Sequence, residues 1–137
     1  MRVALDLALP SDVGQIERVV ARVVATCADL HVPPRHLQFS VPLALTEALS
    51  NAILYGNREE LDRQVRVRAG LEQRALILEV TDEGPGFDLD ACTRDPTAPE
   101  NLEREDGRGL FLMRRLMDRV ERYTDEGNVV RMVLELP

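Results

Sequence analysis

Two polar side chains four residues apart are the first candidates for chemistry in this chain. Glu47 and Asn51 lie in a segment whose apolar residues recur at helical spacing, so we expect them one turn apart on one side of a helix. A carboxylate and a carboxamide so placed can cap, pair with arginine, or hold a metal ion and activate a nucleophile. We expect Gly56 to end the helix, with Asn57 in a turn conformation beside it. The apolar residues that set the spacing are Leu43, Leu45, Ala48, Leu49, Ala52 and Ile53.

A second polar motif, Asp82-x-Gly84-x-Gly86, follows a predicted strand. Glycines let the backbone turn sharply and let a ligand approach closely. A carboxylate at the buried end of a strand needs a hydrogen-bond donor, and the exocyclic amine of adenine is one. The alternative interpretation is a tight turn with an exposed aspartate.

A third motif, Gly107-x-Gly109, stands before a helix that we predict from Leu110 onward. Free N–H groups and the helix dipole at a helix N-terminus favour anions, and glycines let phosphates lie against the backbone. Arg104 and Arg108 can add positive charge there or can be solvated, and we interpret Arg104 as solvated. The motif by itself is also compatible with a simple loop-to-helix turn.

The composition limits what this chemistry can be. The chain has 137 residues and a formal charge of -7, and all 17 of its basic residues are arginine. The absence of lysine excludes a P-loop of the GKS/GKT kind, a kinase strand lysine and a Schiff-base mechanism. The negative charge disfavours direct binding to nucleic acid or to an anionic membrane. Cys27 and Cys92 are interpreted as reduced thiols, with Cys27 in the core.

The remaining pattern predicts the elements that position these motifs. Alternating and helical periodicities give the order strand, helix, helix, two strands, helix, two strands, which predicts an α+β fold. We expect a two-layer α/β sandwich with a mixed, mostly antiparallel sheet and helices on one face. Ser11 or Asp12 is expected to cap the first helix and Ser40 the second. The predicted strands cover residues 2–9, 65–69, 76–80, 120–124 and 129–136.

Taken together, the three motifs resemble the N box and the two glycine boxes of the GHKL ATP-binding superfamily. The segments TEALSNAILYGN, VTDEGPGFD and GRGLFLMRRLMDRVE are most similar to the anti-sigma factor serine/threonine-protein kinases. The resemblance covers nearly the whole chain. It implies one ATP-binding kinase domain, residues 1–137, with an ATP lid at about residues 88–106.

The resemblance also implies a role for each motif residue. Glu47 is the implied general base, which takes the proton from a serine or threonine hydroxyl of a protein substrate. Asn51 is the implied ligand of the Mg²⁺ that accompanies ATP, and Asp82 the implied acceptor of the adenine amine. The other implied nucleotide-binding residues are Gly84, Gly86, Gly107, Arg108, Gly109 and Leu110.

The partners implied by the resemblance are a small anti-sigma-factor antagonist as substrate, a sigma factor that is sequestered, and a second copy in a homodimer. We expect a cytoplasmic protein, since the sequence has neither a signal-like N-terminus nor an apolar run of membrane-spanning length. Two features depart from the family. Asn128-Val129-Val130 stands where relatives often carry a threonine, which predicts weaker ATP binding. The acidic segment 100–106 predicts an altered partner preference or weaker phosphate binding.

Three alternatives stay open at this point. One is a detached histidine-kinase-type catalytic domain, although His31 and His36 flank Pro33-Pro34 and are interpreted as loop or surface residues. Another is a module that binds ATP to switch its affinity for a partner without transferring phosphate. The last is an α+β interaction domain that binds no nucleotide.

Overall fold

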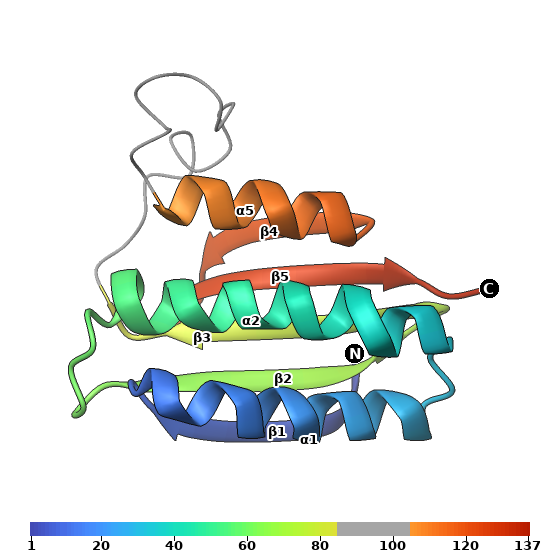
Figure 1. Ribbon diagram of the computed structural model, residues 1–137, viewed down its shortest axis with the longest axis horizontal. Coiled ribbons are helices and arrows are strands. Elements are labelled where there is room, and N and C mark those ends of the chain that lie inside the picture. Colours follow the sequence, from blue (N-terminus) through green and yellow to red (C-terminus); the bar gives the residue numbers. More distant parts are fainter. Residues whose placement is uncertain (85–104) are drawn as a thin grey trace.

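The computed structural model describes residues 1–84 and 105–137, with side chains described from residue 110 onward in the second part. The proposed lid at 88–106 therefore falls almost wholly outside the described residues, and so does Gly86. In the described part, helices form one layer and strands the other (Figure 1). The predicted α+β two-layer sandwich is confirmed.

The sheet contains five strands in the order β1-β2-β3-β5-β4. All of its neighbouring pairs are antiparallel. The prediction of a mostly antiparallel sheet is confirmed, and the predicted strands agree with the observed ones to within one or two residues at most ends. The strands are β1 (Arg2–Pro10), β2 (Gln64–Glu72), β3 (Ala75–Asp82), β4 (Arg119–Thr124) and β5 (Asn128–Glu135).

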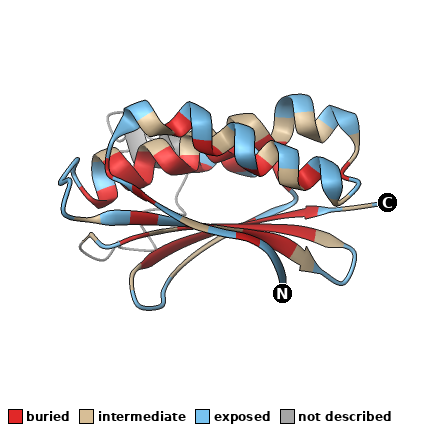
Figure 2. Cartoon of the chain, turned by 90° about the horizontal axis from the view of Figure 1, so that it is seen from below, coloured by how far each residue is buried: buried red, intermediate tan, exposed pale blue. Residues whose placement is uncertain are grey.

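The helices cover one face of this sheet, and the buried residues lie between the two layers (Figure 2). Helix α2 contacts both α1 and α5, so it is the central helix. Leu45 and Leu49 of α2, and Ile53 in the η3 turn that follows it, are fully buried. The helical elements are η1 (Val13–Gln15), α1 (Ile16–Asp29), η2 (His36–Ser40), α2 (Val41–Asn51), η3 (Ala52–Gly56) and α5 (Glu105–Leu116).

The strands separate apolar from charged side chains because alternate residues point to opposite faces. In β2, Val65 and Val67 are fully buried under the helices, while Arg66 and Arg68 lie on the open face of the sheet. Cys27 is fully buried in the core, as predicted, and this burial raises the pKa of its thiol to about 12. No helix in the described part of the chain is long and apolar enough to cross a membrane.

One predicted helix cap and one predicted helix start are wrong. Ser40 does not cap α2, because it has helical backbone angles and no capping hydrogen bond, and the π-helical turn η2 runs directly into α2. Helix α5 begins at Glu105, so Gly107 and Gly109 lie inside its first turns instead of before it. Asp12 does cap η1 by accepting a hydrogen bond from the Gly14 N–H.

Helical structure ends at Gly56, as predicted. The end does not depend on a left-handed conformation of this glycine. Among the described glycines, a positive φ belongs to Gly127, at 143°, and not to Gly56. Asn57 has right-handed angles, φ -86° and ψ -9°. The reversal falls on Arg58 and Glu59, whose φ angles are 53° and 58°.

Candidate functional site

Asp82 is the last residue of β3, and its carboxylate points into the layer of helices. Only 3% of the residue is exposed. Its Oδ1 accepts hydrogen bonds from Asn128 Nδ2 and from the Gly84 N–H, both at 2.9 Å. Asn128 Nδ2 also donates to the Gly84 carbonyl at 2.9 Å. Because Asp82 and Asn128 are paired residues of β3 and β5, the sheet register itself brings this amide to the carboxylate.

The surroundings of Asp82 shift the pKa of its carboxyl group in opposite directions. Burial raises the pKa of this carboxyl above its usual value, since the charged form loses solvation. The hydrogen bonds from Asn128 and Gly84 partly oppose that rise, as do the more distant charges of Arg122 and Arg63. An additional N–H donor from a ligand would favour the ionised form further.

Two glycines bring the end of η3 against the end of β3. A Cβ added at Gly56 would lie 2.3 Å from Oδ2 of Asp82, so the carboxylate rests against the Gly56 backbone. A Cβ added at Gly84 would lie 1.7 Å from the Gly56 carbonyl oxygen. Neither position accepts a side chain without movement of its neighbour.

Asn57 is fully buried beside this contact and joins three separate segments. Its Oδ1 accepts a hydrogen bond from the Glu83 N–H at 2.8 Å. Its Nδ2 donates to Ser11 Oγ and to the Gln64 carbonyl, both at 2.9 Å. The loop after β1, the start of β2 and the end of β3 are therefore tied to one carboxamide.

Glu47 and Asn51 lie one turn apart on α2, as predicted. Asn51 is only 8% exposed. The oxygen of its carboxamide is the kind of ligand that Mg²⁺ prefers. Glu47 is half-buried, and it forms no ion pair with the described residues. The donor set therefore fits a magnesium ion bound together with a ligand that supplies further oxygens.

The described residues of the three motifs lie toward one end of the helical layer. Asn51 and Glu47 stand five and nine residues before Gly56, which is about 7.5 Å and about 13.5 Å along a helix axis at about 1.5 Å per residue. Helix α5 packs beside α2, and its N-terminal end lies at the same end of the molecule as η3 and the end of β3 (Figure 1). Gly107, Arg108 and Gly109 are placed there by backbone alone. Leu110 is 2% exposed and belongs to the core.

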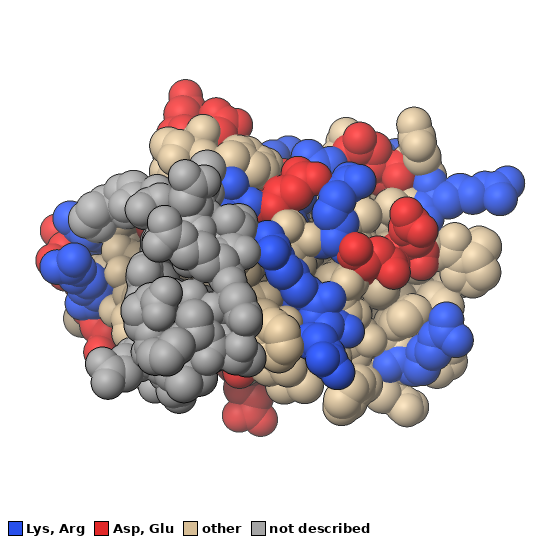
Figure 3. Space-filling view, turned by 90° about the horizontal axis from the view of Figure 1, so that it is seen from above, with Lys and Arg blue, Asp and Glu red and all other residues tan. Residues whose placement is uncertain are grey.

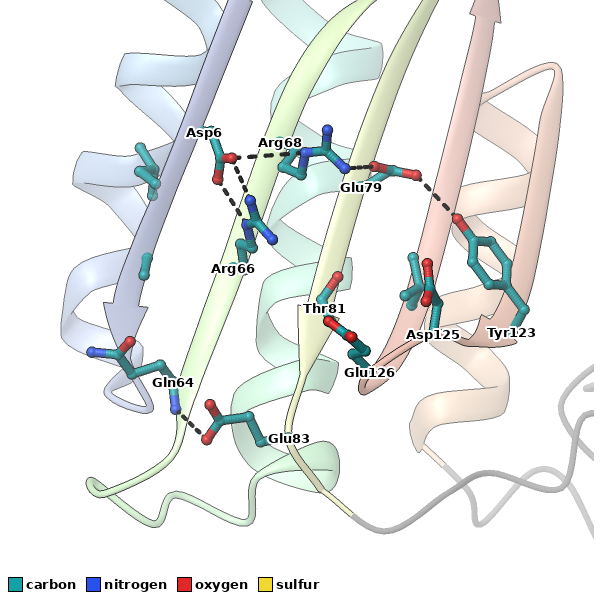
Figure 4. Close-up of a pocket in the computed structure, with 13 residues that line it drawn as sticks. Asp6, Gln64, Arg66, Arg68, Glu79, Thr81, Glu83, Tyr123, Asp125 and Glu126 are labelled. Atoms are coloured by element: carbon teal, nitrogen blue, oxygen red, sulfur yellow. Dashed lines mark hydrogen bonds and ion pairs between the residues drawn. The ribbon is translucent and has the colours of Figure 1, made fainter. Parts of the chain in front are cut away.

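A hollow of about 390 Å³ lies on the other, open face of the sheet (Figure 4). Thr81 and Glu83 line it, whereas Asp82 between them points to the helices. Its charged side chains largely satisfy one another. Arg66 donates to both carboxylate oxygens of Asp6, Arg68 pairs with Glu79 at 3.3 Å, and the Tyr123 hydroxyl donates to Glu79 at 3.0 Å. The hollow and the three motifs thus lie on opposite faces, and we place the candidate site with the motifs.

The described part of the face beside α5 carries side chains of both charges. Figure 3 shows arginines and carboxylates interspersed there. Arg119 pairs with Glu121 at 2.7 Å, and the Arg115 guanidinium lies 5.7 Å from the centre of the Phe111 ring. Mixed charges of this kind are typical of a solvated surface.

Sequence reasoning did not assign these site roles to Gly56, Asn57 and Asn128. The one signal that included Asn128 was the segment Asn128-Val129-Val130, which stands where relatives often carry a threonine. The structure places an amide donor there, directly on Asp82. For Gly56 and Asn57, the text YGN was noted, but the partners lie at distant positions of the chain.

Comparison with known proteins agrees with the geometry. Residues 8–134 match the family described as "Histidine kinase-like ATPase domain". The chain is 35% identical over 95 residues to the serine-protein kinase RsbW of Bacillus subtilis, an alignment that covers 66% of this chain and 59% of the relative. It is 30% identical over 97 residues to the anti-sigma F factor of Clostridium beijerinckii, covering 69% and 67%. The chain thus spans about 59% of the length of the Bacillus relative.

A solved structure shows the same fold. The RsbU and RsbW domains of a Mycobacterium tuberculosis protein superpose with a TM-score of 0.67 at 14% identity. The match covers 96% of this chain and 32% of that one. At this identity the likeness concerns the arrangement of helices and strands.

Proposed function

Because the chain belongs to the histidine kinase-like ATPase domain family, we propose that it binds Mg-ATP and acts as an anti-sigma regulatory factor with serine/threonine-protein kinase activity. One observation carries this proposal. A buried carboxylate at the end of β3 touches the end of the helical segment that carries Asn51 and Glu47. The contact supports the proposal because Asp82, Asn51 and Glu47, to which it assigns nucleotide, metal and base roles, lie on adjoining elements.

In this proposal, Asp82 accepts a hydrogen bond from the adenine amine. Asn51 would hold a magnesium ion through its carboxamide oxygen, and such an ion would supply positive charge against the phosphates. Gly84 and Gly86 shape the adenine end of the pocket. The N-terminal end of α5, with Gly107, Arg108 and Gly109, provides N–H groups and positive charge for the phosphates. Leu110 supports this end from the core.

Glu47 acts as the general base. It takes the proton of a serine or threonine hydroxyl while that oxygen bonds to the γ-phosphorus, and the bond from the γ-phosphorus to the bridging oxygen of ADP breaks. Phosphoryl transfer depends mainly on alignment and on stabilisation of charge, which a rigid helix can supply. The half-buried side chain of Glu47, one turn from Asn51, supports this role.

The protein substrate in this proposal is a small anti-sigma-factor antagonist, and the same protein also sequesters a sigma factor. The names of the relatives support this pairing. We further propose one domain over residues 1–137, a lid at about 88–106, a homodimer and a cytoplasmic location.

The decisive experiment measures phosphate transfer. The purified chain is incubated with Mg²⁺ and γ-labelled ATP, together with each small antagonist-type protein encoded near its gene. We expect label on a serine or threonine of one partner, and we expect Glu47→Gln to reduce the rate at least about 100-fold while ATP still binds, since a general base contributes about 10²–10⁴-fold.

Each of the other outcomes would point to a different function or a different role for Glu47. ATP binding without any label would favour the ATP-gated binding module. A Glu47→Gln variant that transfers phosphate at the parental rate would remove Glu47 as the base. A chain that binds no ATP would overturn the proposal as a whole.

A further inference from the structure

We propose that Gly56 and Asn57 are positioning residues that fix the place of the Asp82 carboxylate and thereby make the site selective for adenine. The proposal rests on the nucleotide-binding function above. Neither residue has a role in the implied motif chemistry, yet both lie directly behind the carboxylate that would contact the base.

Gly56 provides the surface on which the carboxylate rests. A Cβ at this position would lie 2.3 Å from Oδ2, 2.4 Å from Cγ and 2.8 Å from Oδ1 of Asp82. Real Cβ atoms do not come so close to their neighbours, so any side chain at position 56 displaces the whole carboxyl group. Since Gly56 has no positive φ, this contact, and not its backbone angle, is what requires glycine.

Asn57 fixes the backbone from which the carboxylate projects. Its Oδ1 holds the N–H of Glu83, the residue directly after Asp82, at 2.8 Å. Its two amide hydrogens are anchored by Ser11 Oγ and the Gln64 carbonyl. The carboxamide is fully buried, so loss of this network cannot be compensated by bulk water without opening the site.

These contacts decide which face of the carboxylate a ligand meets. The hydrogen bonds from Asn128 and Gly84 both go to Oδ1, and Gly56 flanks Oδ2. A fixed, ionised acceptor matches the amino group of adenine and opposes the carbonyl oxygen that guanine carries at the same position. A site built around one hydrogen bond rejects a ligand that lacks the partner group.

The test compares two nucleotides that differ only in the amine. Dissociation constants are measured by calorimetry for ATP and for purine riboside triphosphate, which has no exocyclic amine. We expect the parent chain to bind ATP about 10- to 100-fold more tightly than purine riboside triphosphate. This ratio corresponds to the free energy of one hydrogen bond to a charged group. We expect Gly56→Ala to reduce this ratio to less than about 3, and Asn57→Ala to reduce it several-fold.

The ratio of the two dissociation constants distinguishes a variant that misplaces the Asp82 carboxylate from one that is only less stable. A variant that is merely less stable loses affinity for both nucleotides equally and keeps the parental ratio. Ser11→Ala is the matched control for Asn57, because it removes the bond from Asn57 to Ser11 Oγ, and the bond from that hydroxyl to the Arg63 carbonyl, but leaves the bond to Glu83 in place. Gly14→Ala is the control for Gly56, because its Cβ would lie 3.2 Å or more from its neighbours. Both controls should keep the parental ratio.

Two outcomes overturn different statements. If Gly56→Ala and Asn57→Ala keep the parental ratio, the positioning role is wrong, although ATP binding stands. If the parent itself binds the two nucleotides equally, the adenine role of Asp82 is wrong, and with it part of the proposed function. Should Asn57→Ala fail to fold, Gly56→Ala decides the question, since it removes none of the hydrogen bonds of Asn57.

Discussion

At the scale of single residues, Asp82 shows the conflict between stability and binding most clearly. Its folded pKa is raised above the unfolded value, chiefly by burial. The native state therefore holds the proton to higher pH than the unfolded state does. Stability contributed by this group is full below the unfolded pKa and is lost as the pH rises through the folded pKa. At neutral pH the ionised carboxylate is a cost to folding.

We therefore expect Asp82→Asn to fold at least as stably as the parent at pH 7.5 while losing about 10- to 100-fold in ATP affinity. The amide oxygen can still accept from Asn128 and Gly84, whereas the charge that costs stability is gone. Thermal unfolding at pH 7.5 and at pH 4 measures the first effect, and calorimetry with Mg-ATP the second. The gain in stability should shrink at the lower pH, and unchanged ATP affinity would contradict the assignment of Asp82.

The residues that sequence reasoning placed correctly are those whose spacing is local. The turn-by-turn relation of Glu47 and Asn51 follows from helix geometry alone. Gly56 and Asn57 received a conformational explanation, because backbone preference is all that a local pattern can report. Their actual contacts are with Asp82 and Glu83, which are 26 residues away in each case. Weaker ATP binding through Asn128 stays a prediction.

At the scale of elements, strands were easier to predict than helix ends. Alternation in β2 marks Val65 and Val67 as buried and Arg66 between them as open, and β2 pairs with β3 in antiparallel fashion. The cap of α2 and the start of α5 were predicted wrongly because packing overrides local signals. η2 continues into α2 past Ser40, and α5 includes the glycines at 107 and 109 despite their low helix propensity.

The apolar face of α2 is buried in the core, and this packing holds Glu47 and Asn51 in place. Leu49 is 0% exposed in the middle of this side. We expect Leu49→Ala to lower the free energy of unfolding by about 2–5 kcal/mol, from lost burial and the cavity left behind. Leu61→Ala, at a residue that is 69% exposed, is the matched control and should change it by less than about 0.5 kcal/mol. Urea unfolding measures both, and equal effects would mean that α2 is not anchored through this side.

At the scale of the whole molecule, the sheet separates two polar regions. Asp82 faces the helical layer that carries Glu47 and Asn51, and the ion pairs around Arg66, Asp6 and Glu79 line the hollow on the open face. The sequence could predict that β2 and β3 have two different faces, but not which one carries a hollow, since that depends on side chains from several strands. The separation gives a direct test of where the nucleotide binds.

A ligand that binds only the folded state raises its stability by about 2.7 kcal/mol at a concentration of 100 times the Kd. For a chain of this length we expect Mg-ATP at that concentration to raise the Tm by about 5–10 °C. Chelation of Mg²⁺ should remove much of the increase, since Asn51 then has no ion to share with the phosphates. Arg66→Ala, which opens the exposed pair with Asp6, should leave the increase unchanged, whereas Gly56→Ala should reduce it. The opposite result would place the nucleotide in the hollow on the open face, with Glu79 and Tyr123 beside it, and the motifs at the other face would then need another ligand.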